Sequence, residues 1–165
     1  AFVFFASFYS AKPIRAKARP IIDSLFSAGH YIATGVFGYY LAGGIHFPTI
    51  GIIAGIAWAV AMHAYSAVPD IKADLQANLK TIAIMIGAKK TIYLCWFLYI
   101  LAAYIVYDII PVASLIGGLT FSYFMWQSVK AKSEEALFRV YTYFPLINTI
   151  IGAIVSIELF SKNIL

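Results

Sequence analysis

Residues 49–68 read TIGIIAGIAWAVAMHAYSAV, a stretch without a single Asp, Glu, Lys or Arg. A helix rises about 1.5 Å per residue and the hydrocarbon core of a bilayer is about 30 Å thick, so this stretch is long enough to cross it. Four more stretches have a similar length and composition, and only the last holds a charged residue, Glu158: they are 26–43, 92–107, 111–129 and 140–160. We therefore predict an all-α, polytopic transmembrane helical bundle with five complete spans.

The overall composition supports a membrane protein. Of the 165 residues, 62% are hydrophobic and 12% are charged, and the mean hydropathy is +0.86. Soluble domains carry roughly 25% charged residues, so a soluble globular domain is excluded. Residues 1–9, AFVFFASFY, are apolar but too short to span, and they lack the charged start and cleavage site of a signal peptide. We expect them to be the end of a further span.

The charged residues are unevenly distributed. All basic residues except Lys162 lie in three connections, 10–23, 69–91 and 130–139, whereas the connections 44–48 and 108–110 contain none. Basic loops stay on the cytoplasmic side, so the spans form a consistent zigzag through the bilayer. The net charge of +5 is explained by this orientation, and nucleic acid is not an expected partner. The single Cys95 lies inside a span and is expected to pack there.

The connection 69–91 also holds two carboxylates, Asp70 and Asp74. Pro69 is a favourable first residue for a short helix, which would place both carboxylates on one face and extend that face to Asn78. Like charges at this spacing repel unless a cation lies near them, and Mg²⁺ uses one or two carboxylates together with phosphate oxygens. The pattern predicts a Mg²⁺ site for a phosphorylated substrate. The alternative is that both aspartates are solvated and balance Lys72 and Lys80.

The connection 10–23 begins with the basic run of Lys12, Arg15, Lys17 and Arg19. These side chains either anchor the chain at anionic headgroups or bind a diphosphate, for which Arg supplies a bidentate fork and Lys a point charge. The connection lies on the same side of the membrane as Asp70, so both could contribute to one site. Asp23 is expected to pair with Arg19 and to have no catalytic role.

Two stretches make the chain resemble the UbiA superfamily of intramembrane prenyltransferases. The first is a YSxxPxRxK-type segment of that family, which is matched by Tyr9, Ser10, Pro13, Arg15 and Lys17. The second is the family's second aspartate-rich motif, DxxxD, which is matched by Asp70 and Asp74. The KT…LG that follows this motif in the family resembles Lys80, Thr81 and Gly87. The runs HAYSAVPDIKAD and RPIIDSL look most like the branch that prenylates carotenoids such as lycopene. The resemblance implies that residues 1–165 form a single transmembrane domain, the C-terminal part of a nine-helix enzyme from the end of span four, without the first aspartate motif.

The resemblance also implies a reaction and a set of site residues. Mg²⁺ held by Asp70 and Asp74 would stabilise the departing diphosphate of an allylic isoprenyl donor, and the acceptor carbon would then attack the allylic cation. By position, Lys80, Lys72, Arg15 and Lys17 are expected to bind the diphosphate. Tyr9, Ser10, Tyr65, His63 and Asn78 are expected on the substrate side, with His63 either a proton acceptor or a packed histidine.

The acceptor remains open between a carotenoid, a quinone precursor and an isoprenoid glycerol lipid. No charged residue lies within 26–68, which favours an apolar acceptor. A second class of function is a cation transporter or channel in which Asp70 and Asp74 bind the ion. Transporters place such groups near the bilayer midplane, whereas these lie at the membrane edge, so we favour the enzyme.

Overall fold

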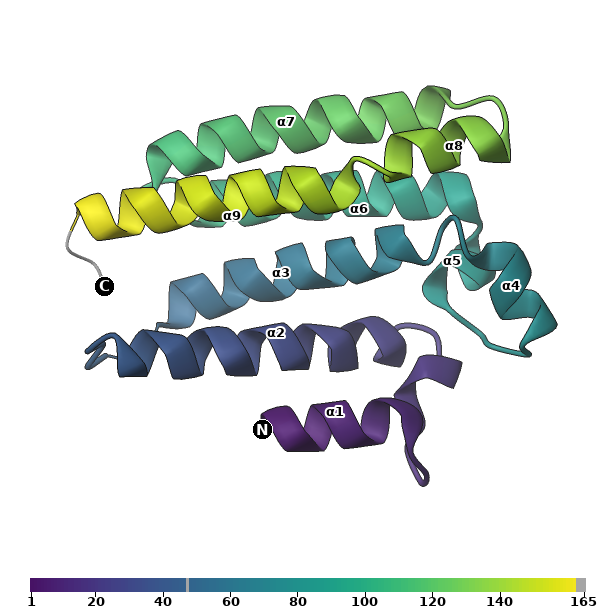
Figure 1. Ribbon diagram of the computed structural model, residues 1–165, viewed down its shortest axis with the longest axis horizontal. Coiled ribbons are helices and arrows are strands. Elements are labelled where there is room, and N and C mark those ends of the chain that lie inside the picture. Colours follow the sequence, from purple (N-terminus) through teal and green to yellow (C-terminus); the bar gives the residue numbers. More distant parts are fainter. Residues whose placement is uncertain (47, 163–165) are drawn as a thin grey trace.

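The computed structural model is all-helical and describes residues 1–46 and 48–162. Residue 47, in the expected connection 44–48, and the last three residues of the expected domain 1–165 lie outside this description. Five long helices lie side by side, and the shorter helices gather at one end of the bundle (Figure 1). The elements are α1 Phe2–Ser10, a 3₁₀ turn Ala16–Ala18, α2 Ile22–Leu41, α3 Thr49–Ser66, α4 Ile71–Gln76, α5 Ile82–Ile86, α6 Ala88–Ile105, α7 Pro111–Lys130, α8 Glu134–Tyr141 and α9 Phe144–Ser161.

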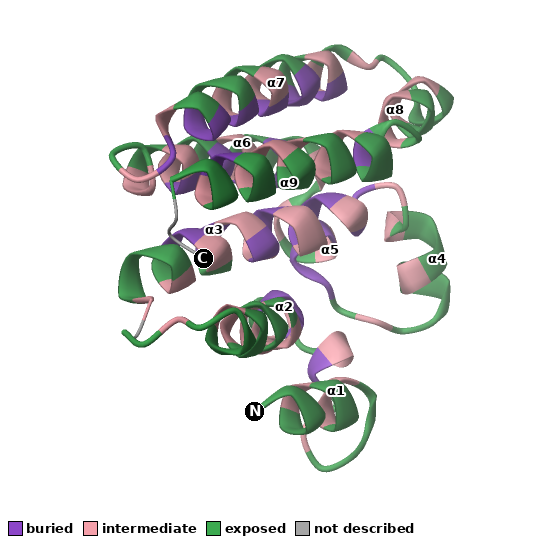
Figure 2. Cartoon of the chain, turned by 60° about the vertical axis from the view of Figure 1, so that its left-hand side comes forward, coloured by how far each residue is buried: buried purple, intermediate pink, exposed green. Residues whose placement is uncertain are grey.

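The five apolar stretches predicted as spans correspond to α2, α3, α6, α7 and α9. By length and composition, three segments of the described chain can cross a membrane: α3, α6 and the segment 134–161, which joins α8 to α9. The helices α2 and α7 are 20 residues long and include more polar side chains. Large apolar side chains are exposed along the bundle, as expected where lipid rather than water surrounds the helices (Figure 2).

Small residues allow the central helices to approach closely. The buried side chains of α3 are mainly alanines, and α3 packs most extensively against α6, which in turn packs against α7. The core continues at the end of the bundle near α4, where Tyr65, Phe124 and Phe144 meet. Cys95 is fully buried in this core with a free thiol, as predicted from its place in the sequence.

Two of the basic connections contain short helices. The helix α8 lies in the basic connection 130–139, where the hydroxyl of Ser133 accepts a hydrogen bond of 3.2 Å from the backbone N–H of Ala136. The helices α4 and α5 lie in the connection 69–91, and α5 ends at Gly87, whose φ of 83° favours glycine. These short helices bring the charged segments to the same end of the bundle (Figure 1).

Candidate active site

Asp70 and Asp74 lie one helical turn apart at the end of the bundle where α3 leads into α4 (Figure 1). Asp70 occupies the N-cap position of α4 without a side-chain capping hydrogen bond, and the backbone N–H of Asp74 donates a hydrogen bond of 2.8 Å to the carbonyl oxygen of Asp70. The backbone therefore places the two residues one helical turn apart. The helix begins at Ile71 and not, as we had predicted, at Pro69.

The environment of Asp74 suits a cation. Partial burial and the neighbouring carboxylate of Asp70 raise the pKa of Asp74, because both disfavour its negative charge. A divalent ion between two such oxygen donors would remove this penalty, and two carboxylates are a number that Mg²⁺ uses. The described residues form no group of three or more His, Cys, Asp or Glu side chains that could hold a metal ion. Asp70 and Asp74 are the two carboxylates that could hold a Mg²⁺ ion here, with water and phosphate oxygens as its other ligands.

Asn78 does not extend the carboxylate face, contrary to our prediction. The helix α4 ends at Gln76, and Asn78 has a φ of 53°, in the left-handed region that Asn tolerates better than most residues. Its side chain is exposed, as is that of Lys80 in the segment leading to α5. Asn78 therefore has a structural explanation as the residue that turns the chain after α4.

Lys72 is engaged elsewhere. Its ammonium group lies 2.7 Å from the carboxylate of Glu134 at the start of α8, and both side chains are largely exposed. This contact raises the pKa of Lys72. The ion pair joins α4 to α8, two segments that are distant in the sequence.

The first basic connection leads from α1 into α2 at the same end of the bundle (Figure 1). Tyr9 is half-buried in the last turn of α1, and its ring meets the rings of His30 and His63 edge-on, with centroids 6.0 Å away in each case. Ser10 and Arg15 are exposed, and Lys17 is half-buried. Among the described residues, neither Arg15 nor Lys17 forms an ion pair, so both are free to bind an anion.

Asp23 is the residue whose environment sequence reasoning missed. We predicted a pair with Arg19, but only the backbone N–H of Asp23 contacts that residue, through a hydrogen bond of 3.0 Å to its carbonyl oxygen. The carboxylate is fully buried in the first turn of α2, and its Oδ2 atom lies 3.7 Å from Nε2 of His63. The available signal was an acidic residue at the edge of a stretch that is otherwise apolar.

Tyr65 belongs to the core rather than to an open surface. Its side chain is fully buried, its hydroxyl lies 2.9 Å from Oγ of Ser128 in a hydrogen bond, and its ring packs against Phe144 with the centroids 4.9 Å apart. The prediction that Tyr65 binds substrate finds no support in this placement.

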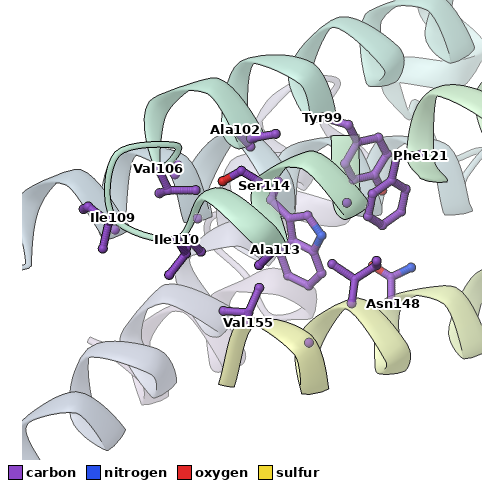
Figure 3. A pocket seen from close by; sticks show the side chains of 18 of the residues that line it. Tyr99, Ala102, Val106, Ile109, Ile110, Ala113, Ser114, Phe121, Asn148 and Val155 are labelled. Atoms are coloured by element: carbon purple, nitrogen blue, oxygen red, sulfur yellow. The ribbon is translucent and has the colours of Figure 1, made fainter. Parts of the chain in front are cut away.

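An apolar cavity of about 620 Å³ lies between α3, α6, α7 and α9, in the half of the bundle away from α4 (Figure 3). Tyr99 and Phe121 form one wall, with their rings stacked at a centroid distance of 4.0 Å. Most of the remaining lining is aliphatic or glycine. The cavity can accommodate a long hydrocarbon but offers no charged side chain to hold a diphosphate.

Comparison with known proteins identifies the family of this chain. Residues 1–148 match the model of the UbiA prenyltransferase family, and the chain belongs to that family. Its members are membrane-embedded enzymes, and the predicted family is confirmed.

Several relatives have names that refer to carotenoids. The chain is 35% identical over 150 residues to "Lycopene elongase/hydratase" of Haloarcula japonica. The alignment covers 88% of this chain and 48% of the relative. The chain is 34% identical over 158 residues to a protein of the same name from Corynebacterium glutamicum, covering 92% of this chain and 55% of the relative. The chain thus spans about half the length of these relatives. No solved structure matches it.

Proposed function

We propose that the chain takes part in Mg²⁺-dependent transfer of an isoprenyl group from an allylic diphosphate to a lipophilic acceptor. The observation that carries this proposal is the pair Asp70 and Asp74, one turn apart at the end of a helical bundle that belongs to a prenyltransferase family. Among acceptors, a carotenoid such as lycopene is favoured. The reason is that relatives whose length this chain covers to about one half are named for lycopene.

The membrane arrangement is part of the proposal. Residues 1–165 form one transmembrane domain that corresponds to the latter part of the family's fold. The helices α2, α3, α6, α7 and α9 cross the bilayer, and α1 packs against α2. The basic connections and the site then face the cytoplasm, which agrees with the gathering of basic segments at one end of the bundle.

Each polar group at this end has a proposed task. Asp70 and Asp74 would hold Mg²⁺, which supplies positive charge next to the departing diphosphate. Lys80, Arg15 and Lys17 bind the diphosphate oxygens, and Lys72 can join them only when its ion pair with Glu134 opens.

Tyr9 and Ser10 lie on the substrate side, at the end of α1. The half-buried ring of Tyr9 stabilises the allylic cation through its face and excludes water from it.

The apolar cavity supports a hydrocarbon acceptor. An aromatic acid would need a cationic partner, and no Lys or Arg lines this space, whereas a polyene requires only apolar walls. A quinone precursor and an isoprenoid glycerol lipid are the competing acceptors. A cation transporter, the other class of function, is disfavoured because the chain belongs to a prenyltransferase family.

The test uses membranes that contain the complete gene product. Dimethylallyl diphosphate is supplied with lycopene, 4-hydroxybenzoate or geranylgeranylglyceryl phosphate, with Mg²⁺ or with EDTA. We expect a product from lycopene, only with Mg²⁺, and a loss of at least about 100-fold for Asp70→Asn and for Asp74→Asn. Asp108→Asn, an exposed carboxylate between α6 and α7, is the matched control and should keep full activity. Undiminished transfer by both site variants would contradict the metal assignment.

A further inference from the structure

The carboxylate of Asp23 is buried without a full set of partners. Its side chain is 0% exposed, and its Oδ1 atom accepts a long hydrogen bond of 3.4 Å from the hydroxyl of Ser24. Its Oδ2 atom has no hydrogen-bond partner among the described residues, and Nε2 of His63 lies 3.7 Å away. A buried carboxylate in this state costs stability, so packing alone does not account for Asp23.

The pair of Asp23 and His63 lies beside the candidate site. The His63 side chain is 16% exposed, so a small group can reach its ring. Three titratable groups lie near the pair: Tyr9 from α1, whose ring contacts that of His63; His30 from α2, whose ring also contacts that of Tyr9; and Asp74 from α4, within electrostatic range of both members. His63 on α3 thus contacts the buried carboxylate of α2 and lies within electrostatic range of Asp74.

We propose that His63 is the base that completes prenyl transfer and that Asp23 is the residue that positions it; the assignment rests on the proposed function. Departure of the diphosphate breaks the bond from its oxygen to the allylic carbon, and the electron pair leaves with the diphosphate. A double bond of the acceptor supplies the pair for the new C–C bond, which leaves a carbocation on the acceptor. His63 takes a proton from the carbon next to that cation, and the C–H electron pair becomes a new C=C bond.

Asp23 makes this step possible in two ways. Its carboxylate faces Nε2 of His63 and favours the tautomer that carries the proton there, so the Nδ1 lone pair is left to accept the substrate proton. Once the imidazolium has formed, the same carboxylate stabilises its positive charge. Asp70 and Asp74 are less suited to this task, because the metal assignment occupies their oxygen atoms.

The acceptor cation has a second fate, capture by water, which gives an alcohol instead of an alkene. The ratio of alkene to alcohol therefore reports directly on the base. A residue with only a structural role would change the amount of folded enzyme and would leave this ratio unaltered.

The experiment compares His63→Gln and Asp23→Asn in membranes that contain the complete gene product. Dimethylallyl diphosphate, lycopene and Mg²⁺ are supplied, both products are quantified, and folded enzyme is measured by size-exclusion chromatography in detergent. We expect the ratio of alkene to alcohol to fall at least about tenfold in both variants, within the usual contribution of general-base catalysis. The matched controls are His46→Gln and Asp108→Asn, exposed residues at the opposite end of the bundle, which should keep the wild-type ratio.

Each other outcome has a defined meaning. If both folded variants keep the wild-type ratio of alkene to alcohol, the roles of His63 and Asp23 are overturned and the proposed function is not. Loss of alkene and alcohol together in folded variants places the pair earlier in the reaction and also overturns it. If Asp23→Asn does not fold, His63→Gln decides the question, since it leaves the buried carboxylate in place. Absence of Mg²⁺-dependent transfer by the wild type overturns the proposed function, and this assignment with it.

Discussion

Asp74 is a carboxylate whose charge is penalised in the folded protein. Its pKa is raised by burial and by Asp70, so the folded state binds a proton at Asp74 more readily than the unfolded state does. Stability associated with this group is thus present at acid pH and is lost as the pH rises through the raised pKa. Mg²⁺ at the pair would reverse the loss at neutral pH.

Asp74→Asn should reveal this penalty. In EDTA at neutral pH, we expect the variant to gain up to about 0.5 kcal/mol in free energy of unfolding, because like charges one turn apart repel. The gain should shrink as the pH falls and Asp74 of the wild type becomes protonated. Mg²⁺ should stabilise the wild type at neutral pH and leave Asp74→Asn unchanged. Thermal unfolding in detergent measures all of these quantities, and equal stabilisation of both proteins by Mg²⁺ would place the ion elsewhere.

Some residues of the site could be predicted and others could not. The spacing of Asp70 and Asp74 is local, so the sequence contains it. The partnership of Asp23 with His63 joins α2 to α3, and the burial of Tyr65 depends on α7 and α9. Such contacts depend on how helices pack, and hydrophobic periodicity does not specify which faces meet.

Glu158 illustrates the same limit for whole elements. It is the charged residue of the predicted span 140–160, and its carboxylate is buried and accepts hydrogen bonds from the backbone N–H groups of Val112, at 3.2 Å, and Ala113, at 2.7 Å. It therefore caps the N-terminus of α7 from the neighbouring helix α9. Ile110, the residue at the cap position of α7, has no side-chain acceptor for this purpose.

Removal of this cap should loosen the ends of α7 and α9 that lie far from α4. We expect the melting temperature in detergent to fall in the order wild type, Glu158→Gln, Glu158→Ala, because Gln retains one acceptor and Ala none. The control is Ser156→Ala on the same helix, whose hydroxyl donates a hydrogen bond to the carbonyl oxygen of Gly152. A melting temperature of Glu158→Ala equal to that of the control would show that water replaces the carboxylate without loss.

The boundaries of the long helices agree with the sequence prediction to within a few residues, because each is a long apolar run between charged connections. The short helices were harder to predict. The helix α8 has its start signal in Ser133 followed by two glutamates, but the basic residues around it indicated a loop. The shortness of α4, with its end at Gln76, follows from the turn at Asn78.

At the scale of the whole molecule, the charge distribution predicts the orientation in the membrane. Lys132→Cys, in the connection before α8, and Asp108→Cys, between α6 and α7, introduce thiols at opposite ends of the bundle, and both positions are exposed. A membrane-impermeant maleimide should label Lys132→Cys only in inside-out vesicles and Asp108→Cys only in right-side-out vesicles.

The native protein supplies the background for this measurement. Cys95, the single cysteine of these 165 residues, is fully buried and should not react in intact vesicles. Labelling of both introduced thiols from one side would contradict the zigzag of α6 and α7 through the bilayer. Labelling of Cys95 in the wild type would show that the core around it opens.

The ion pair between Lys72 and Glu134 bears on how the protein responds to ionic strength. Both side chains are largely exposed, so dissolved salt weakens the attraction, and the pair contributes little to stability. Ile71, at the start of α4, instead packs against the buried core. Hydrophobic contacts of this kind are not screened by ions. The two carboxylates of α4 should therefore keep their position from dilute buffer to concentrated brine.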